Sequence, residues 1–183
     1  MRIDESKPAF NFNPVVFPNE WQKNKGGGTI PASPRAEAYR GYFQALIDEL
    51  RTKYKFTGAK VGQPQNWYSF SSGVGGIIFS NSFSQGGKIR AEFYIDLYDK
   101  EQNKQLFDRL HEHQSEVEKE FGESLSWERL DERRACRIAV YREGTIESSA
   151  AILDELRRWS IENLLKLKQL LLPRAKKLLN NEK

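Results

Sequence analysis

The sequence has little cysteine and little histidine, and this scarcity excludes several kinds of site. The single cysteine, Cys136, cannot form a disulfide within the chain. The two histidines, His111 and His113, are spaced i, i+2 on a predicted helix, so their side chains point to different faces. No cluster of cysteine and histidine has the spacing of a structural zinc site. We therefore predict no metal site and no cofactor.

The sequence also lacks any long apolar run. No segment approaches the roughly 18–20 apolar residues that a helix needs to cross a bilayer. The first apolar residues of the chain are interrupted by Pro14 and Pro18, and they do not form the apolar core of a signal peptide. Together with the single cysteine, these absences predict a soluble cytoplasmic protein with no membrane partner.

Neither sign of charge dominates. The 183 residues carry 29 Lys and Arg against 25 Asp and Glu, a net charge of +4. A chain of this length suits one domain with a sizeable core. The mild basicity permits a nucleic-acid partner without arguing strongly for one.

Residues 1–33 have the composition of a connecting segment that still packs against something. Several prolines and the triple glycine at 26–28 prevent a long helix. Phe12, Phe17 and Trp21 make the segment too apolar for a plain linker. We expect an extended interdomain-like tail at 1–33, with these three aromatic residues as candidates for protein interaction, followed by a single domain at 34–179.

The rest of the chain predicts alternating runs of strands and single helices. Ser33 and Pro34 have the pattern of a helix start, and apolar residues at helical spacing follow to about residue 54. Strands are expected at 67–71, 77–83, 88–98, 125–130 and 136–141, and a helix that Asp99 caps is expected to end at Gly122. A last helix begins near residues 148–149, and Pro173 is expected to kink or end it. The order α-βββ-α-ββ-α predicts an α+β fold, with a mainly antiparallel sheet of about five strands packed by three helices.

The third strand alternates strictly between apolar and polar residues, which predicts one face on a core and one face in water. Aromatic and arginine side chains gather on or beside the polar strand faces, a combination that stacks bases and holds phosphates. The same pairs can simply bridge neighbouring strands. The candidate residues for nucleic-acid binding are Trp67, Tyr68, Arg90, Tyr94, Arg134 and Arg137.

No catalytic residues are predicted. Glu92 and Asp96 share a strand face, but four residues at about 3.3 Å each put them about 13 Å apart, too far to share one metal ion. The glycine-rich segment 71–76 lacks the lysine of a phosphate-binding loop and joins a strand to a strand, so it predicts a tight hairpin. Cys136 lies in a predicted strand between buried neighbours, which favours a small core side chain.

Four short sequence motifs, in the same order along the chain, resemble the bacterial "domain of unknown function 4268" family over about residues 35–178. They are Trp67-Tyr-Ser-Phe70, Glu92-Phe-Tyr-Ile-Asp96, Trp127-Glu-Arg-Leu130 and Arg134-Ala-Cys-Arg-Ile138. The resemblance implies a domain that often follows a nuclease-like domain of the PD-(D/E)XK type. Residues 8–21 resemble the junction between those two domains. The expectation is then a chain without its nuclease-like half, as in a split gene, a late start or a stand-alone accessory domain, with no family catalytic residue to carry over.

These observations leave two function hypotheses. The first is a non-catalytic module associated with nucleic acid and coupled to a nuclease-like domain or subunit. The alternative is a protein-interaction or dimerisation module, in which the tail docks onto another domain and the helices form a homodimer surface. A stand-alone hydrolase would need converging acids that the linear sequence does not show.

Overall fold

The computed structural model describes residues 33–180, which lie in the second of two compact units of the chain, 32–183. The described part begins with α2 (Pro34–Thr52), followed by β1 (Trp67–Val74), β2 (Ile77–Ser84) and β3 (Lys88–Ile95). Then come α3 (Lys100–His111), α4 (Gln114–Phe121), β4 (Ser126–Glu128), β5 (Cys136–Glu143) and α5 (Ala150–Asn180).

The strands form one antiparallel sheet in the order β1-β2-β3-β5-β4. Tight glycine-bearing hairpins join β1 to β2 and β2 to β3, as the sequence predicts for 71–76. β5 pairs with β3 and receives the short β4 on its outer side. The predicted α+β fold with a five-stranded antiparallel sheet is thus confirmed.

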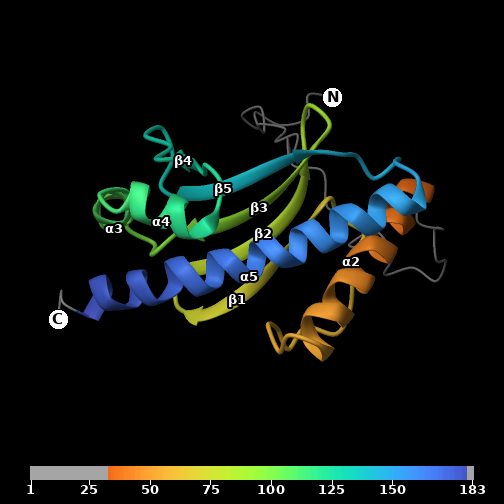
Figure 1. Ribbon diagram of the computed structural model, residues 1–183, viewed down its shortest axis with the longest axis horizontal. Coiled ribbons are helices and arrows are strands. Elements are labelled where there is room, and N and C mark those ends of the chain that lie inside the picture. Colours follow the sequence, from red (N-terminus) through yellow and green to blue (C-terminus); the bar gives the residue numbers. More distant parts are fainter. Residues whose placement is uncertain (1–32, 181–183) are drawn as a thin grey trace, which may run out of the picture. The chain divides into compact units, whose positions relative to one another are not determined.

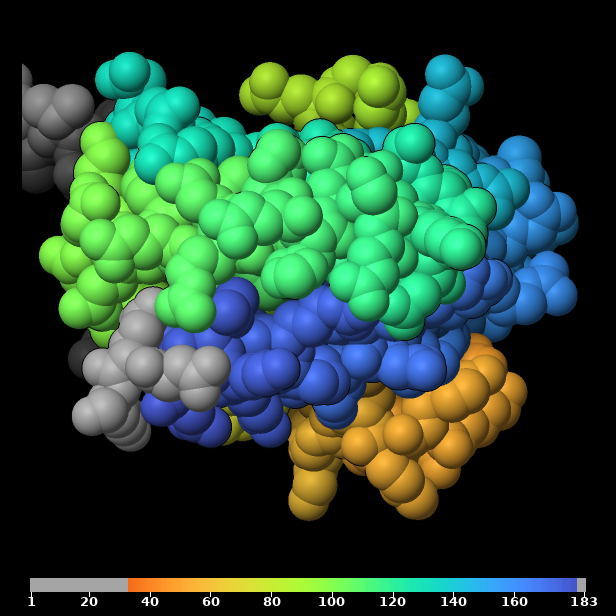
Figure 2. All heavy atoms as spheres, turned by 60° about the vertical axis from the view of Figure 1, so that its left-hand side comes forward, coloured from red at the N-terminus to blue at the C-terminus, as the bar shows by residue number. Residues whose placement is uncertain are grey.

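The four helices of residues 33–180 pack on the same face of the sheet, which we call the core face. α5 crosses β1, β2 and β3, and it has α3 and α4 on one side and α2 on the other (Figures 1 and 2). Aromatic pairs place α2 and α3 on this face too, because Tyr42 contacts Phe83 and Phe107 contacts Trp127. Within residues 33–180, no helix covers the other face of the sheet.

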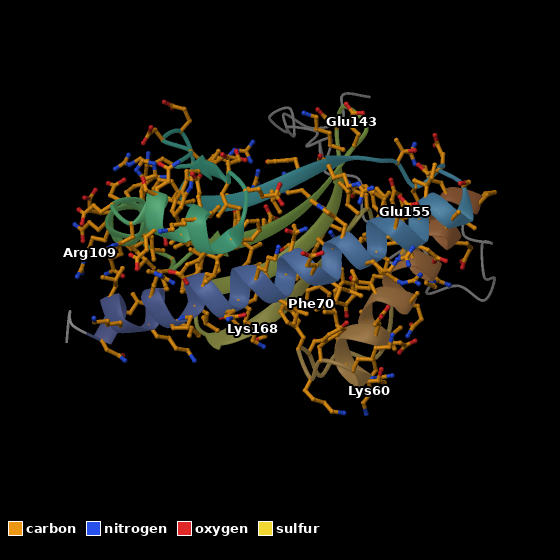
Figure 3. The ribbon with its side chains drawn as sticks, in the orientation of Figure 1. Lys60, Phe70, Arg109, Glu143, Glu155 and Lys168 are labelled. Carbon is orange, nitrogen blue, oxygen red and sulfur yellow. The ribbon has the colours of Figure 1, made fainter. Side chains whose placement is uncertain are left out.

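A row of phenylalanines across the sheet forms the centre of the core. Phe70, Phe79 and Phe93 lie opposite one another on β1, β2 and β3, and each is at most 1% exposed. Figure 3 shows Phe70 where β1 passes α5. Full burial of such a side chain contributes about 1.5–3 kcal/mol. The alternation predicted for β3 is confirmed on this side, because Ile89, Ala91, Phe93 and Ile95 are all fully buried.

Two helix starts follow the predicted capping pattern. The Ser33 side chain accepts a hydrogen bond from the Ala36 amide, with Pro34 at the first helical position of α2. The Asp99 side chain accepts from the Gln102 amide at the start of α3. A side-chain acceptor satisfies an amide that no helical carbonyl can reach.

The prediction of one helix from Asp99 to Phe121 is wrong. The segment divides into α3 and α4 around Glu112 and His113, and the His113 amide donates to the Leu110 carbonyl in a tighter turn. Leu110 and Val117, on either side of the break, are both fully buried. A strict period of 3.6 residues would put an exposed histidine on the buried stripe between them.

Pro173 does not end the last helix. α5 continues to Asn180, seven residues beyond the proline. Proline lacks the amide that would bond to the carbonyl four residues earlier. Next to it, the Arg174 guanidinium donates to the Leu170 carbonyl at 2.8 Å. The burial of Leu171, Leu172 and Ala175 holds both sides of the proline against the core.

Candidate functional site

The second face of the sheet, which we call the open face, is built from the side chains that alternate with the core. The register places Trp67, Ser82, Arg90 and Tyr141 in one row across four strands. The next row holds Ser69, Ser80, Glu92 and Ala139, and Ser71, Ile78, Tyr94 and Arg137 form a third. The predicted polar face therefore exists and extends over the whole sheet.

An ionic cluster occupies the middle of the open face. The Glu92 Oε2 atom lies 2.9 Å from Nε of Arg90 and 2.5 Å from Nε of Arg137. Arg137 also reaches Glu128 at 3.0 Å, and the Tyr141 hydroxyl donates to the same carboxylate at 2.5 Å. The charges of the two arginines and the two carboxylates sum to zero. A charged ligand would therefore compete with ion pairs that already exist within the cluster.

The expectation that this face is simply wet is wrong at Glu92. The whole residue is only 5% exposed, although it sits on the polar side of β3. Burial raises the pKa of the Glu92 carboxyl, and the charges of Arg90 and Arg137 offset only part of this rise. The arginines gain their positions in turn from aromatic neighbours, since Arg90 lies 5.8 Å from the Tyr141 ring and Arg137 5.9 Å from the Tyr94 ring.

Two shallow hollows flank the cluster. The first, which we call the serine hollow, has a volume of about 380 Å³. It is lined by Asn66, Trp67, Ser69, Ile78, Ser80, Ser82, Phe83, Ser84, Arg90, Glu92 and Tyr94. The second, the basic hollow, has a volume of about 690 Å³. It is lined by Ser84, Gln85, Lys88, Arg90, Ser126, Glu128, Arg133, Arg137 and Tyr141.

The basic hollow carries an excess of positive charge. Its lining includes the cations Lys88, Arg90, Arg133 and Arg137 and the single carboxylate of Glu128. Lys88 and Arg133 are exposed and have no ion pair with any residue in the range 33–180. Unlike the arginines of the ionic cluster, these two cations keep their charge available to a ligand.

The structure brings together four of the six predicted nucleic-acid residues. Trp67, Arg90 and Tyr94 line the serine hollow, and Arg90 and Arg137 line the basic hollow. Trp67 stands out from the surface with 46% of its area exposed, which is unusual for an indole beside a hollow. These positions follow directly from the register of β1, β3 and β5.

Tyr68 and Arg134 lie elsewhere. Tyr68 belongs to the core face, where its ring packs 5.1 Å from Phe70 and its hydroxyl donates to the Val61 carbonyl. Arg134 forms a two-pronged ion pair with Asp96, with both N–O distances 2.7 Å, and covers the Tyr98 ring. The placement of Tyr68 beside a polar strand face is wrong, because the alternation puts residue 68 on the same side as residue 70.

The predicted protein-interaction residues, Phe12, Phe17 and Trp21, lie outside the described residues.

Sequence reasoning missed the features that shape the hollows. Lys88 is the first residue of β3 and Arg133 lies in the loop before β5, and a single basic residue at such a position gives no sequence pattern. The serines of β2 gave a weak signal, because Ser80, Ser82 and Ser84 alternate with larger residues. Small side chains on one face of a strand leave a depression between the larger ones on its neighbours.

A buried lysine fixes the loop that carries Arg133. Lys104 of α3 is 3% exposed, and its Nζ donates to the backbone carbonyls of Arg129, Leu130 and Ala135. Three charge-assisted bonds satisfy the full donor capacity of a lysine. The loop before β5 is therefore tied to α3, and Arg133 is presented at a defined edge of the basic hollow.

The basic residues of α5 are mostly committed to other contacts. Arg157 pairs with Asp154, Lys166 with Glu162, and Arg174 with Glu120. Lys168, labelled in Figure 3, donates to the Phe56 carbonyl and lies 4.5 Å from the Phe56 ring. The helix face therefore offers less free charge than its composition suggests.

Within residues 33–180, no three His, Cys, Asp or Glu side chains are placed to hold a metal ion. Glu92 is engaged by two arginines and Asp96 by Arg134. In the same range, no helix is long and apolar enough to span a membrane.

The fold and the face together define a class: an α+β domain in which the helices of residues 33–180 cover one side of an antiparallel sheet, while the polar side carries two shallow hollows. The chain belongs to the domain of unknown function 4268 family, whose model matches residues 38–175. Comparison with curated proteins found no match, and comparison with solved structures found none.

Proposed function

We propose that this domain is a non-catalytic module that binds nucleic acid on the open face of its sheet and works with a nuclease-like domain or subunit. The observation that carries the first part is the basic hollow. It combines four cations with one carboxylate, and two of those cations, Lys88 and Arg133, have no ion pair within residues 33–180. Phosphate oxygens are the natural partners of such free cations.

The aromatic side chains beside the hollow support a nucleic-acid ligand over a simple anion. Trp67 is exposed at one side of the face and Tyr94 lines the same side of the ionic cluster. A positively charged groove next to exposed aromatic rings is the arrangement that single-stranded nucleic acids use. The partnership with a nuclease-like domain is supported by the family resemblance, which implies a domain that often follows a nuclease-like domain in the same chain.

The ionic cluster predicts which arginines matter least for affinity. Arg90 and Arg137 already contact Glu92, so a phosphate would have to compete with a buried carboxylate. Lys88 and Arg133 lose only water when a phosphate arrives. The binding energy from charge is therefore expected to come mainly from these two exposed residues.

The test is fluorescence polarisation of the full chain with a labelled single-stranded oligonucleotide, over a series of salt concentrations. We expect binding at low salt, and a double variant Lys88→Gln/Arg133→Gln to weaken it about tenfold or more. The plot of log K against log salt should also flatten by about 1.4, because each lost phosphate contact on a single strand contributes about 0.7.

A matched control removes the same charge from another surface. Lys176→Gln/Lys177→Gln lies on exposed positions of α5 and should change affinity much less. No binding at low salt would refute the proposal. Equal weakening by the two double variants would show that net charge, and not the basic hollow, sets the affinity.

A further inference from the structure

We propose that the serine hollow holds one unstacked nucleobase, so that the open face selects single strands. The inference rests on the function proposed above and assigns a role to a part of the face that phosphate binding leaves unused. Its starting point is the shape of the hollow. Its floor is formed by Ser80 and Ser82 of β2, and larger side chains of β1 and β3 stand around it.

The hollow contains a buried hydroxyl with no partner. Ser82 is 5% exposed, and its Oγ atom makes no hydrogen bond within the described residues. The neighbouring serines differ, since Ser69 and Ser80 bond to each other at 2.8 Å and Ser84 donates to the Lys88 carbonyl. An unpartnered buried hydroxyl costs free energy unless a ligand or water bonds to it. Ser82 lines the hollow, so its unused donor and acceptor lie directly beneath any ligand that settles there.

The walls of the hollow suit a flat, uncharged ring with polar edges. Trp67 presents an exposed indole at the rim, and Ile78 adds an apolar contact. Arg90 and Glu92 supply a donor and an acceptor on the β3 side, and their charges compensate each other. A neutral heterocycle with both N–H donors and ring acceptors matches this lining, whereas a phosphate would meet the Glu92 carboxylate.

The two hollows adjoin in the way that one nucleotide requires. Ser84 and Arg90 line both of them. A base in the serine hollow would thus place its sugar near the shared edge and its phosphate toward Lys88. Bases inside a duplex are stacked and paired, so only a single strand, a loop or a flipped base can present a ring to such a hollow.

The test compares three ligands of equal length on the full chain by fluorescence polarisation: a single strand of mixed sequence, an abasic single strand and a duplex. We expect the base-bearing single strand to bind about tenfold more tightly than the abasic strand, in line with the stacking of one base on an aromatic side chain. It should also bind more tightly than the duplex.

Two variants remove the hollow in different ways. Ser82→Leu fills the floor of the hollow. Trp67→Ala removes the exposed side chain at its rim, and because Trp67 is exposed, this second variant is expected to fold normally. Each should bring the ratio of base-bearing to abasic affinity close to one while the abasic affinity stays unchanged. Ser71→Leu, an exposed serine on the same face that does not line the hollow, is the matched control and should keep the ratio.

Equal affinity for the base-bearing and abasic strands would overturn the base site and leave phosphate binding on the open face intact. Equal affinity for the duplex would overturn the selection of single strands. A loss of the ratio in Ser71→Leu to the same extent as in Ser82→Leu would also contradict the assignment to this hollow. Absence of binding to all three ligands would refute the function and the base site together.

Discussion

The arginines of this domain differ in how much of their charge is already compensated within the fold. Arg90 and Arg137 share the buried carboxylate of Glu92, and Arg134 is clamped on Asp96. Arg133 is adjacent to Arg134 in the chain but has no ion pair within residues 33–180. The sequence shows four similar residues, and only the three-dimensional arrangement tells which of them is free.

Arg134→Ala is expected to raise the pKa of Asp96 and to remove an acid-sensitive part of the stability. The hydrogen bonds from Arg134 are the main reason why the pKa of this carboxyl lies below its ordinary value of 3.8. A carboxyl whose folded pKa is lowered stabilises the protein above its unfolded pKa, and this stabilisation is lost as the pH falls through the folded pKa. The Arg134 side chain is 50% exposed, so screening by solvent should keep the loss of stability at neutral pH small.

The measurement is a pH titration of the Asp96 carboxyl by nuclear magnetic resonance, with urea unfolding near pH 7 and near pH 3. The stability gap between the natural chain and Arg134→Ala should narrow at the lower pH. Arg133→Ala removes the same charge one residue earlier and should leave the Asp96 titration almost unchanged. An equal shift in both variants would mean that general electrostatics, and not the ion pair, controls this carboxyl.

At the residue scale, the candidate site could be predicted only in part. Alternation along β3 correctly separated Arg90 and Tyr94 from the core residues, because a strand turns successive side chains to opposite faces. The same rule applied to β1 separates Trp67 from Tyr68, and it was the wrong grouping of these two that misplaced Tyr68. The burial of Glu92 could not be foreseen, since it depends on Arg137 arriving from a strand 45 residues later.

The elements show which local signals outweigh tertiary packing and which do not. Capping residues set the starts of α2 and α3 correctly, because they act on amides within three residues. At Pro173, by contrast, the local signal does not determine the end of the helix. Its local preference to end a helix is outweighed by apolar residues on both sides that pack against the core.

Replacing Pro173 by alanine is expected to stabilise the domain by about 1–2 kcal/mol. Proline inside a helix costs about 3 kcal/mol relative to alanine, and alanine would supply the missing amide to the Gln169 carbonyl. Part of the gain is offset because proline also restricts the unfolded chain. The side chain of Pro173 is exposed, so its removal leaves no cavity in the core.

Chemical and thermal unfolding of Pro173→Ala would measure this gain. Gln169→Ala, which keeps the proline and changes a neighbouring helix position, separates the backbone effect from a general change in helix propensity. A destabilised Pro173→Ala would show that α5 needs a bend at this point to bury Leu172 and Ala175 together.

For the whole molecule, the order of elements was enough to predict the fold class. It did not predict which face of the sheet the helices cover and which face carries the hollows. Runs of strands separated by helices indicate α+β, and the antiparallel sheet follows from short connections. Which helices cover which side depends on how β5 inserts between β3 and β4, a contact distant in sequence. The basic hollow on the open face arises from that insertion, because Arg133, Arg137 and Tyr141 reach it only through β5 and the loop before it.

The domain is expected to fold and to keep its open face without residues 1–32. Among the described residues, the buried core cluster begins at Tyr39 and ends at Ala175, and the residues lining the two hollows lie between Asn66 and Tyr141. A chain of about 150 residues buries enough apolar surface to fold cooperatively. Deletion of residues 1–32 should therefore leave a single unfolding transition with a free energy within about 1 kcal/mol of that of the full chain, and the affinity for a single strand should be retained. Urea unfolding, light scattering and the polarisation measurement on both chains would check this.

A shorter chain that lacks a cooperative transition would show that the first 32 residues complete the core. A change from dimer to monomer on deletion, with binding unaffected, would place assembly in those residues and nucleic-acid recognition in the sheet, because the two properties would then be carried by separate parts of the chain.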